Sequence, residues 1–131
     1  MKTLNLQVVH RILLRGLLDG ESKKGHTLSA INQIMKIIDK VAITEEENKD
    51  YNLRTELNYP QDPTKGGMLK WEQFKKGDKK IEIDVFKPFE LSDEQVGMIK
   101  EIIESKNKAK EFTANDLKIM DIAEQLEIKL E

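Results

Sequence analysis

The feature that most constrains this chain is a change in the spacing of its apolar residues. Toward both ends of the sequence they recur every three or four positions, as on one face of a helix, whereas in the middle they alternate with polar residues. The alternation is clearest in residues 80–86, where Ile81, Ile83 and Val85 share one face of an expected strand. The sequence therefore predicts an α+β fold, with helices at both ends and antiparallel strands between them.

The N-terminal part predicts two helices and a short third one. The first helix is expected over residues 4–18 and is followed by a glycine-flanked polar loop at 20–26. Thr27 is expected to cap the second helix, which has the strongest apolar stripe of the chain. Thr44 and Glu47 form a capping-box pattern ahead of the third helix, since each side chain can accept a hydrogen bond from the other's backbone N–H.

The central part predicts a β-hairpin over residues 68–86, with its turn in the lysine-rich segment 75–79. Residues 53–57 also alternate, so a three-stranded antiparallel sheet is the alternative. The segment 59–67 contains two prolines and two glycines and is expected to be a loop. Because an isolated hairpin is only marginally stable, we expect the strands to pack on the helices.

Two further capping patterns predict two C-terminal helices. Ser92 and Gln95 form a second capping box, and Thr113 is expected to cap the last helix. Pro88 is expected to end the last strand of the hairpin. No repeat or interdomain linker is visible, and the length suits one domain, so we predict a single domain over residues 1–131.

Composition excludes several kinds of site. The chain has no cysteine, which excludes disulfides, thiolate zinc sites and cysteine nucleophiles. Its longest apolar runs are far shorter than the roughly 20 residues that span a bilayer, and no signal-peptide pattern opens the sequence. We therefore expect no membrane association and a cytoplasmic location.

Charge is unevenly distributed although the net charge is only −2. Residues 1–40 carry seven Lys and Arg against three Asp and Glu, whereas residues 91–131 carry six against ten. Such polarity is usual for solvated helices. It also allows head-to-tail self-association or an acidic partner-binding face.

No catalytic or metal-binding motif is evident. The two histidines, His10 and His26, lie on different expected elements, without an Asp or Glu at a metal-ligand spacing. Gly66 and Gly67 precede a strand and not a helix, so they do not form a phosphate-binding loop. No serine has the flanking residues of a nucleophile elbow. We therefore predict a protein that is not an enzyme and needs no cofactor or metal.

The candidate binding residues gather around the expected hairpin and the short third helix. Lysines at the hairpin turn could bind phosphates, and nearby aromatic side chains could stack on bases, as in a winged-helix protein. The acidic start of the third helix would be repelled by phosphates, which disfavours nucleic acid. The aromatic side chains are expected to belong to the core, although an exposed one would be the best anchor for a protein partner. The candidates are Trp71, Phe74, Lys75, Lys76, Lys79, Lys80, Glu45, Glu46 and Glu47.

The arrangement of several short motifs resembles a group of small, uncharacterised proteins of tailed bacteriophages and prophages. These motifs are the segments Leu4–Leu6 and Ile12–Leu14, the turn Thr44–Glu47, the strand Gly67–Trp71 and the alternating Ile81–Ile83, followed by Leu91–Glu94 and Phe112–Thr113. They are mostly caps and core positions, so the resemblance indicates a fold more than a function. It implies an accessory protein acting in the cytoplasm of a host bacterium.

The sequence thus leaves three functional hypotheses. The first is a non-enzymatic accessory protein that binds another protein, either a host protein, including one of anti-phage defence, or a second copy of itself. The second is a winged-helix-like nucleic-acid-binding protein. The third is an oligomeric component of a virion or of its assembly.

Overall fold

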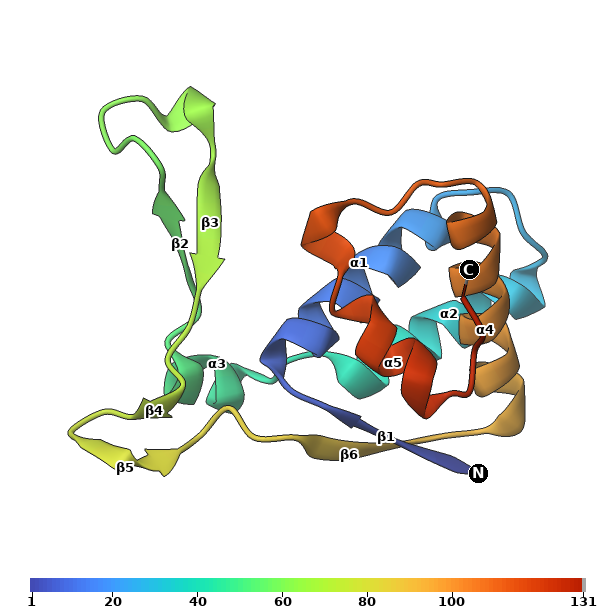
Figure 1. Ribbon diagram of the computed structural model, residues 1–131, viewed down its shortest axis with the longest axis horizontal. Helices are drawn as coiled ribbons and strands as arrows, with labels where there is room; N and C mark the ends of the chain where they lie inside the picture. Colours follow the sequence, from blue (N-terminus) through green and yellow to red (C-terminus); the bar gives the residue numbers. More distant parts are fainter. Residues whose placement is uncertain (131) are drawn as a thin grey trace. The chain divides into compact units, whose positions relative to one another are not determined.

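The computed structural model describes residues 1–130, and the chain divides into two compact units (Figure 1). The helical unit comprises Met1–Ala42 and Phe86–Glu131, and the hairpin unit comprises Ile43–Val85. Helices and small antiparallel sheets both occur, which confirms the predicted α+β class. Cooperative unfolding of the two units is a separate property, so the single domain stays a prediction.

The helical unit packs four helices with a two-stranded sheet around one apolar core. In chain order its elements are β1 (Lys2–Leu6), α1 (Val8–Ser22), α2 (Leu28–Val41), β6 (Lys87–Leu91), α4 (Asp93–Lys108), the 3₁₀ helix η2 (Ala114–Asp116) and α5 (Ile119–Gln125). Figure 1 shows α1 and α2 as neighbours and β1 beside β6. The core combines buried Leu, Ile and Val side chains from both strands and all four helices, among them Leu4, Leu14, Ile37, Leu91, Ile99 and Ile122.

The N-terminal helix prediction is wrong at both ends. The residues expected to begin that helix form β1, and α1 continues beyond residue 18 to Ser22. Leu4 and Leu6 alternate with exposed residues and are fully buried, which is the pattern of a strand with one face on the core. Gly20 does not stop α1, because it lies in the last turn of the helix, where the entropic cost of glycine is small.

The β1–β6 sheet accommodates a proline without losing a ladder hydrogen bond. Pro88 lies in β6 opposite Asn5 of β1, although it was predicted to end a strand. The backbone of Asn5 points away from β6, since its N–H and C=O bond the side-chain amide of Gln125 at 2.7 and 2.8 Å. The missing N–H of Pro88 therefore faces outward, and Gln125 covers the free edge of β1 at Asn5.

A buried arginine joins the first two helices. Arg11 of α1 is only 3% exposed, and its guanidinium donates to the carbonyls of Val41 and Ala42 at 2.9 and 2.7 Å. These carbonyls lie at the C-terminus of α2, where a helix leaves acceptors unpaired and favours a cation. The same guanidinium lies 5.0 Å from the centre of the Phe89 ring.

The hairpin unit contains one short helix and two separate ribbons. Its elements are α3 (Glu45–Tyr51), β2 (Arg54–Leu57), the 3₁₀ helix η1 (Pro63–Lys65), β3 (Gly67–Lys70), β4 (Phe74–Lys75) and β5 (Asp78–Glu82). In Figure 1 the β2–β3 ribbon extends as an arm from α3 and the β4–β5 hairpin. We call residues 54–70 the arm. Gly67 is required where its strands approach, because a Cβ there would lie 2.6 Å from the Glu56 carbonyl oxygen.

The strand pairing of this unit corrects the prediction of one hairpin over residues 68–86 and its three-stranded alternative. β3 pairs with β2, and β4 pairs with β5, so the described residues form separate two-stranded sheets. The chain changes partner at residues 71–73, where the N–H of Glu72 donates to the Tyr51 carbonyl at 2.7 Å. The predicted turn is present, with Gly77 at φ 86°.

Three of the four residues predicted to cap an α-helix do so, and the prediction for Thr113 is wrong. Thr27 accepts the Ala30 N–H, and both Thr44 and Ser92 form reciprocal capping boxes. Thr113 forms its box with Asp116 but begins the 3₁₀ helix η2, and the last helix starts after it. Local side-chain chemistry therefore predicts the starts of α2, α3 and α4 but not that of α5.

Candidate partner-binding surfaces

The hairpin unit contains a cleft lined largely by lysines. It has a volume of about 460 Å³ and lies between the end of α3 and the β4–β5 turn. Its lining includes three predicted binding lysines and the aromatic ring of Phe74, which is 44% exposed. The lining residues are Lys49, Asp50, Asn52, Glu72, Phe74, Lys75, Lys76, Gly77 and Lys79. We call this the lysine cleft.

The charge of the lysine cleft is predominantly positive. Four lysines line it together with two carboxylates, Asp50 and Glu72. Glu72 already pairs with Arg54, whose Nη1 lies 3.2 Å from its Oε1. The lysines therefore outnumber the carboxylates, and Glu72 is partly neutralised by a residue outside the lining.

Two local features set the walls of the cleft. The two-residue turn at Lys76 and Gly77 carries lysines on both sides of the β4–β5 hairpin. On the opposite wall, α3 ends at Asn52, which adopts a left-handed conformation with φ 50° and reverses the chain. The sequence pattern identified the lysines of the turn but not Lys49 and Asp50, because nothing local shows that α3 faces this turn.

Trp71 does not line the cleft, although it was a candidate binding residue. Its ring is half-buried, and its indole N–H donates to Oδ2 of Asp84 at 2.9 Å. Asp84 is one of the few buried polar residues and lies just beyond β5. This hydrogen bond joins the segment between β3 and β4 to the chain after β5, which gives Trp71 a structural position.

The remaining candidates lie apart from the lysine cleft. Glu45, Glu46 and Glu47 form the first turn of α3, whereas the cleft lies at the other end of this helix. The carboxylate of Glu47 accepts the Thr44 N–H at 3.1 Å in the capping box. Lys80 is exposed on β5 but does not belong to the cleft lining.

The arm exposes an apolar face that the sequence analysis did not assign to binding. Antiparallel pairing places Leu69 opposite Thr55 and Leu57 opposite Gly67, so these four residues share one face. Leu57 and Leu69 are 39% and 42% exposed. The alternation in residues 53–57 was visible in the sequence, but its apolar side was expected to be covered by helices.

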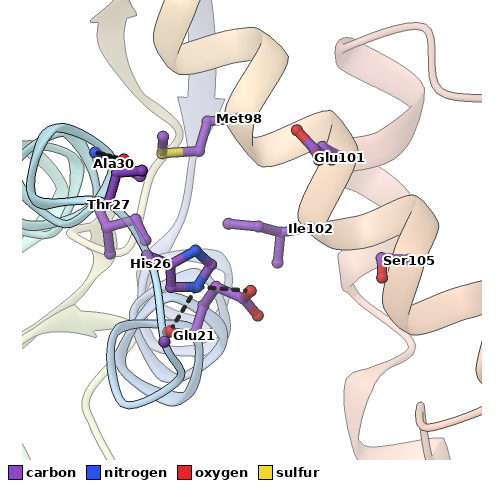
Figure 2. A pocket seen from close by; sticks show the side chains of 10 residues that line it. Glu21, His26, Thr27, Ala30, Met98, Glu101, Ile102 and Ser105 are labelled. Atoms are coloured by element: carbon purple, nitrogen blue, oxygen red, sulfur yellow. Dashed lines mark hydrogen bonds and ion pairs between the residues drawn. The ribbon is translucent and has the colours of Figure 1, made fainter.

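The helical unit contains a second hollow, between the α1–α2 connection and α4 (Figure 2). It has a volume of about 780 Å³, and Ile34, Met98 and Ile102 form apolar parts of its wall. Nε2 of His26 lies 3.1 Å from both Oε1 and the backbone oxygen of Glu21. We call this the His26 pocket; sequence analysis expected His26 to be an ordinary loop residue.

The other histidine has a structural position. His10 is 1% exposed, its Nδ1 accepts the Gln7 N–H at 3.1 Å, and its Nε2 lies 2.8 Å from Oδ2 of Asp121. An acceptor at Nδ1 assigns the ring proton to Nε2, which donates to Asp121. The ring thus connects the start of α1 to α5. Within residues 1–130 no three His, Asp or Glu side chains are grouped so as to hold a metal ion.

Comparison with known proteins found no similar protein. No family model, no curated protein and no solved structure matches the chain. Among residues 1–130 there is also no helix with the length and apolar character needed to cross a membrane.

Proposed function

We propose that this chain is a non-enzymatic binding protein whose lysine cleft docks onto an acidic segment of a partner protein. The observation that carries this proposal is the exposed ring of Phe74 among Lys75, Lys76 and Lys79. An aromatic side chain gives an apolar anchor, and the lysines around it favour a partner with carboxylates beside an apolar residue. The resemblance to bacteriophage accessory proteins supports a host or defence protein in the bacterial cytoplasm as this partner.

A synthetic peptide tests the chemistry of the cleft directly. We expect a short peptide rich in Glu with a central Leu to bind in calorimetry, and its basic counterpart with Lys in place of Glu not to bind. Phe74→Ala should weaken binding about tenfold or more, since it removes the apolar anchor. Phe86→Ala is the matched control, because Phe86 is also a half-exposed phenylalanine and lies in the helical unit.

The charge requirement has its own pair of variants. Lys76→Glu should weaken binding of the acidic peptide about fivefold, whereas Lys36→Glu on α2 makes the same change in net charge outside the cleft. Equal effects of the two variants would show a response to net charge alone and would contradict the proposal. Equal binding of the acidic and basic peptides would contradict it as well.

Photo-crosslinking tests the proposal with a protein partner. A photoreactive amino acid at position 74 should capture a defined acidic protein from bacterial lysate, and the same amino acid at position 86 should not. The captured protein, purified, should then bind the chain and lose affinity with Phe74→Ala. A captured protein that binds the Phe74→Ala variant unchanged would argue against the cleft as the docking site.

A nucleic-acid-binding function is the second candidate, because lysines beside an exposed ring also suit phosphates and stacked bases. Against a winged helix, α3 belongs to the hairpin unit, whereas α1 and α2 belong to the helical unit. We expect no band shift with double- or single-stranded DNA at low salt, where phosphate-based affinity is greatest. A shift that weakens steeply with salt would favour nucleic acid over an acidic protein.

An assembly function is the third candidate, and the exposed apolar face of the arm favours it. A second copy could pack the same face against Leu57 and Leu69. We expect a monomer in light scattering, because the binding proposal places recognition in the lysine cleft. An oligomer that dissociates with Leu69→Lys but persists with Lys70→Glu would favour assembly through the arm.

A further inference from the structure

The arm has two strand edges that pair with no other strand. Within residues 1–130, β2 and β3 form a sheet of their own, so each strand has a neighbour on one side only. Figure 1 shows them side by side as the two strands of the arm. An unpaired edge presents a row of backbone N–H and C=O groups that another strand can bind. Each edge of the arm can therefore receive a further strand.

The register of the arm shows which backbone groups face the outer edge of β2. The N–H of Asn58 donates to the Gly66 carbonyl at 3.1 Å, so the backbone of Asn58 faces β3. Backbone direction alternates along an antiparallel strand, so Glu56 also faces β3, whereas Thr55 and Leu57 face outward. The N–H and C=O groups of Thr55 and Leu57 are thus directed at a strand added beside β2.

The segment Leu53–Leu57 is complementary to itself. When two copies of it pair antiparallel about a two-fold axis at Thr55, Arg54 lies opposite Glu56 of the other copy, and Leu53 lies opposite its Leu57. Opposite charges placed across two strands stabilise their pairing. The outward-facing residues also lie opposite each other in this register, so they can exchange hydrogen bonds. Charge, apolar side chains and backbone direction therefore agree on one pairing.

Charge distinguishes this register from its neighbours. A two-fold axis at Arg54 or at Glu56 would also bring outward-facing backbone groups together, but it would place two like charges opposite each other. The outer edge of β3 offers no charge complement, because an axis at Leu69 places Lys70 opposite Met68. The edge of β2, with the axis at Thr55, is therefore the favoured contact.

The side chains needed for this contact are accessible. Thr55, Glu56 and Leu57 are exposed, and Arg54 is partly exposed. Nε of Arg54 lies 3.2 Å from Oε1 of Glu56 in the same strand, so these two charges lie on one face of the arm. A second copy adds the same two charges in reverse order, and positive and negative side chains then alternate across the joined strands.

From this pattern we propose that two copies of the chain pair their β2 strands antiparallel about Thr55. The product is a four-stranded sheet in the order β3–β2–β2–β3. The two Thr55 residues exchange two backbone hydrogen bonds, and each Leu57 N–H donates to the Leu53 carbonyl of the other copy. The Leu53 N–H adds none, because it donates to the Asn48 carbonyl at 3.3 Å. The contact uses neither the lysine cleft nor the apolar face of the arm.

A dilution series of the intact chain tests the contact. So small an interface should have a dissociation constant of about 1 mM, which leaves a monomer at the micromolar concentrations of light scattering. Between about 20 μM and about 2 mM, the NMR signals of the Thr55 and Leu57 amides should shift, and translational diffusion should slow. The amides of Gly67 and Leu69 on the other edge should shift less. No change with concentration, or larger shifts at Gly67 and Leu69, would overturn the proposal.

Charge reversal tests the register. Arg54→Glu and Glu56→Arg should each weaken pairing about fivefold, because each places like charges opposite each other. An equimolar mixture of these two variants should recover pairing, since the reversed charges then meet their opposites across the axis. Lys70→Glu, a charge reversal on β3, is the matched control and should leave pairing unchanged. A mixture that pairs no better than either variant alone would overturn the proposed register.

A proline tests the backbone contact. Thr55→Pro removes an outward N–H but no bond to β3, as Pro88 does in β6, and it should abolish pairing at about 2 mM. Thr55→Val keeps the N–H and should pair like the unchanged chain. An unchanged Met68 amide signal would show that the arm of Thr55→Pro is intact, since Met68 lies opposite Glu56. Undiminished pairing of Thr55→Pro would overturn the proposal.

Two further variants separate edge pairing from the other contacts considered above. Leu69→Lys should leave edge pairing intact, whereas it would disrupt packing of the apolar faces of two arms. Phe74→Ala should also leave it intact, so the result does not depend on binding of an acidic peptide in the lysine cleft. Loss of pairing in Leu69→Lys together with full pairing in Thr55→Pro would assign face packing and overturn the edge contact.

Discussion

The helical unit and the hairpin unit differ in how much apolar surface their folding buries. Nearly all buried apolar side chains of the described residues lie in the helical unit, whereas Tyr51 is the one fully buried apolar residue in the hairpin unit. Apolar burial is the main source of folding free energy, so the hairpin unit depends more on hydrogen bonds and turn chemistry. The comparison teaches that side chains free for recognition, such as Phe74, gather where the core is small.

The largest expected effect comes from a cavity in the helical core. Ile99→Ala removes a fully buried side chain and should lower the free energy of unfolding by about 3 kcal/mol, measured by urea denaturation. Leu69→Ala on the exposed face of the arm should change it by less than about 0.5 kcal/mol. Similar losses in the two variants would mean that Leu69 is buried in solution, and the contrast between the units would fail.

The same denaturation experiment tests the prediction of a single domain. Trp71 is the one tryptophan of the sequence and lies in the hairpin unit, so its fluorescence reports that unit. Far-UV circular dichroism reports mainly the helices, most of which lie in the helical unit. We expect the fluorescence transition at a lower urea concentration than the dichroism transition, because the hairpin unit buries fewer apolar side chains and local stability follows local burial. Coincident transitions would instead confirm one cooperative domain.

The second-largest expected effect on stability comes from Arg11, the buried cation of the helical unit. Arg11→Met keeps an apolar side chain but removes the donors to the Val41 and Ala42 carbonyls, and should cost about 2 to 3 kcal/mol. Arg15→Met is the control, since Arg15 is an exposed residue of the same helix whose ion pair with Asp19 is worth little. Equal urea midpoints for the two variants would show that the C-terminus of α2 does not depend on Arg11.

The sequence predicts structure that depends on neighbouring residues better than structure that depends on residues far apart in the chain. The caps at Thr27, Thr44 and Ser92 were predicted because capping involves side chains within three residues of each other. The strand β1 was missed because its partner β6 lies in a distant part of the chain, and Leu6 also fits a helical spacing. Spacing alone does not identify a partner at such separation.

The candidate site shows the same limit. The lysines of the β4–β5 turn were predicted as binding residues because they are adjacent in sequence to Trp71 and Phe74. The two aromatic side chains differ in the fold, because Phe74 is exposed whereas Trp71 is half-buried. This difference depends on Asp84, which becomes the acceptor of the Trp71 indole only after the chain folds. The opposing walls of the His26 pocket, from α1 and α4, likewise meet only in the folded chain.

The third-largest expected effect on stability is confined to the hairpin unit. Asp84→Ala removes the acceptor of the Trp71 indole and should destabilise this unit by about 1 to 2 kcal/mol, with a red-shifted Trp71 emission. Asp84→Asn keeps a carbonyl acceptor and should recover part of the loss. Far-UV dichroism of the helices should change little in either variant. If Asp84→Ala lowers the urea midpoint of the helical dichroism as much as Ile99→Ala does, the two units are strongly coupled.

The smallest expected effect compares the same capping chemistry in both units. Ser92→Ala at α4 and Thr44→Ala at α3 each remove one side-chain acceptor from a capping box, at about 1 kcal/mol in its own unit. α4 is a longer helix with a buried face, so Ser92→Ala should lower the global urea midpoint while α4 remains folded. α3 has seven residues, and Tyr51 is its one buried residue, so Thr44→Ala should open it locally.

Hydrogen exchange measures this difference at single amides. The last-turn amide of Tyr51 should exchange several-fold faster in Thr44→Ala, because a helix of this length has little packing to hold it when a cap is lost. The amides of Ile99 and Ile103 in Ser92→Ala should exchange faster only as far as global stability falls. If the Tyr51 amide exchanges no faster in Thr44→Ala, contacts other than the cap stabilise α3, and the stability of the hairpin unit does not depend only on its caps and turns.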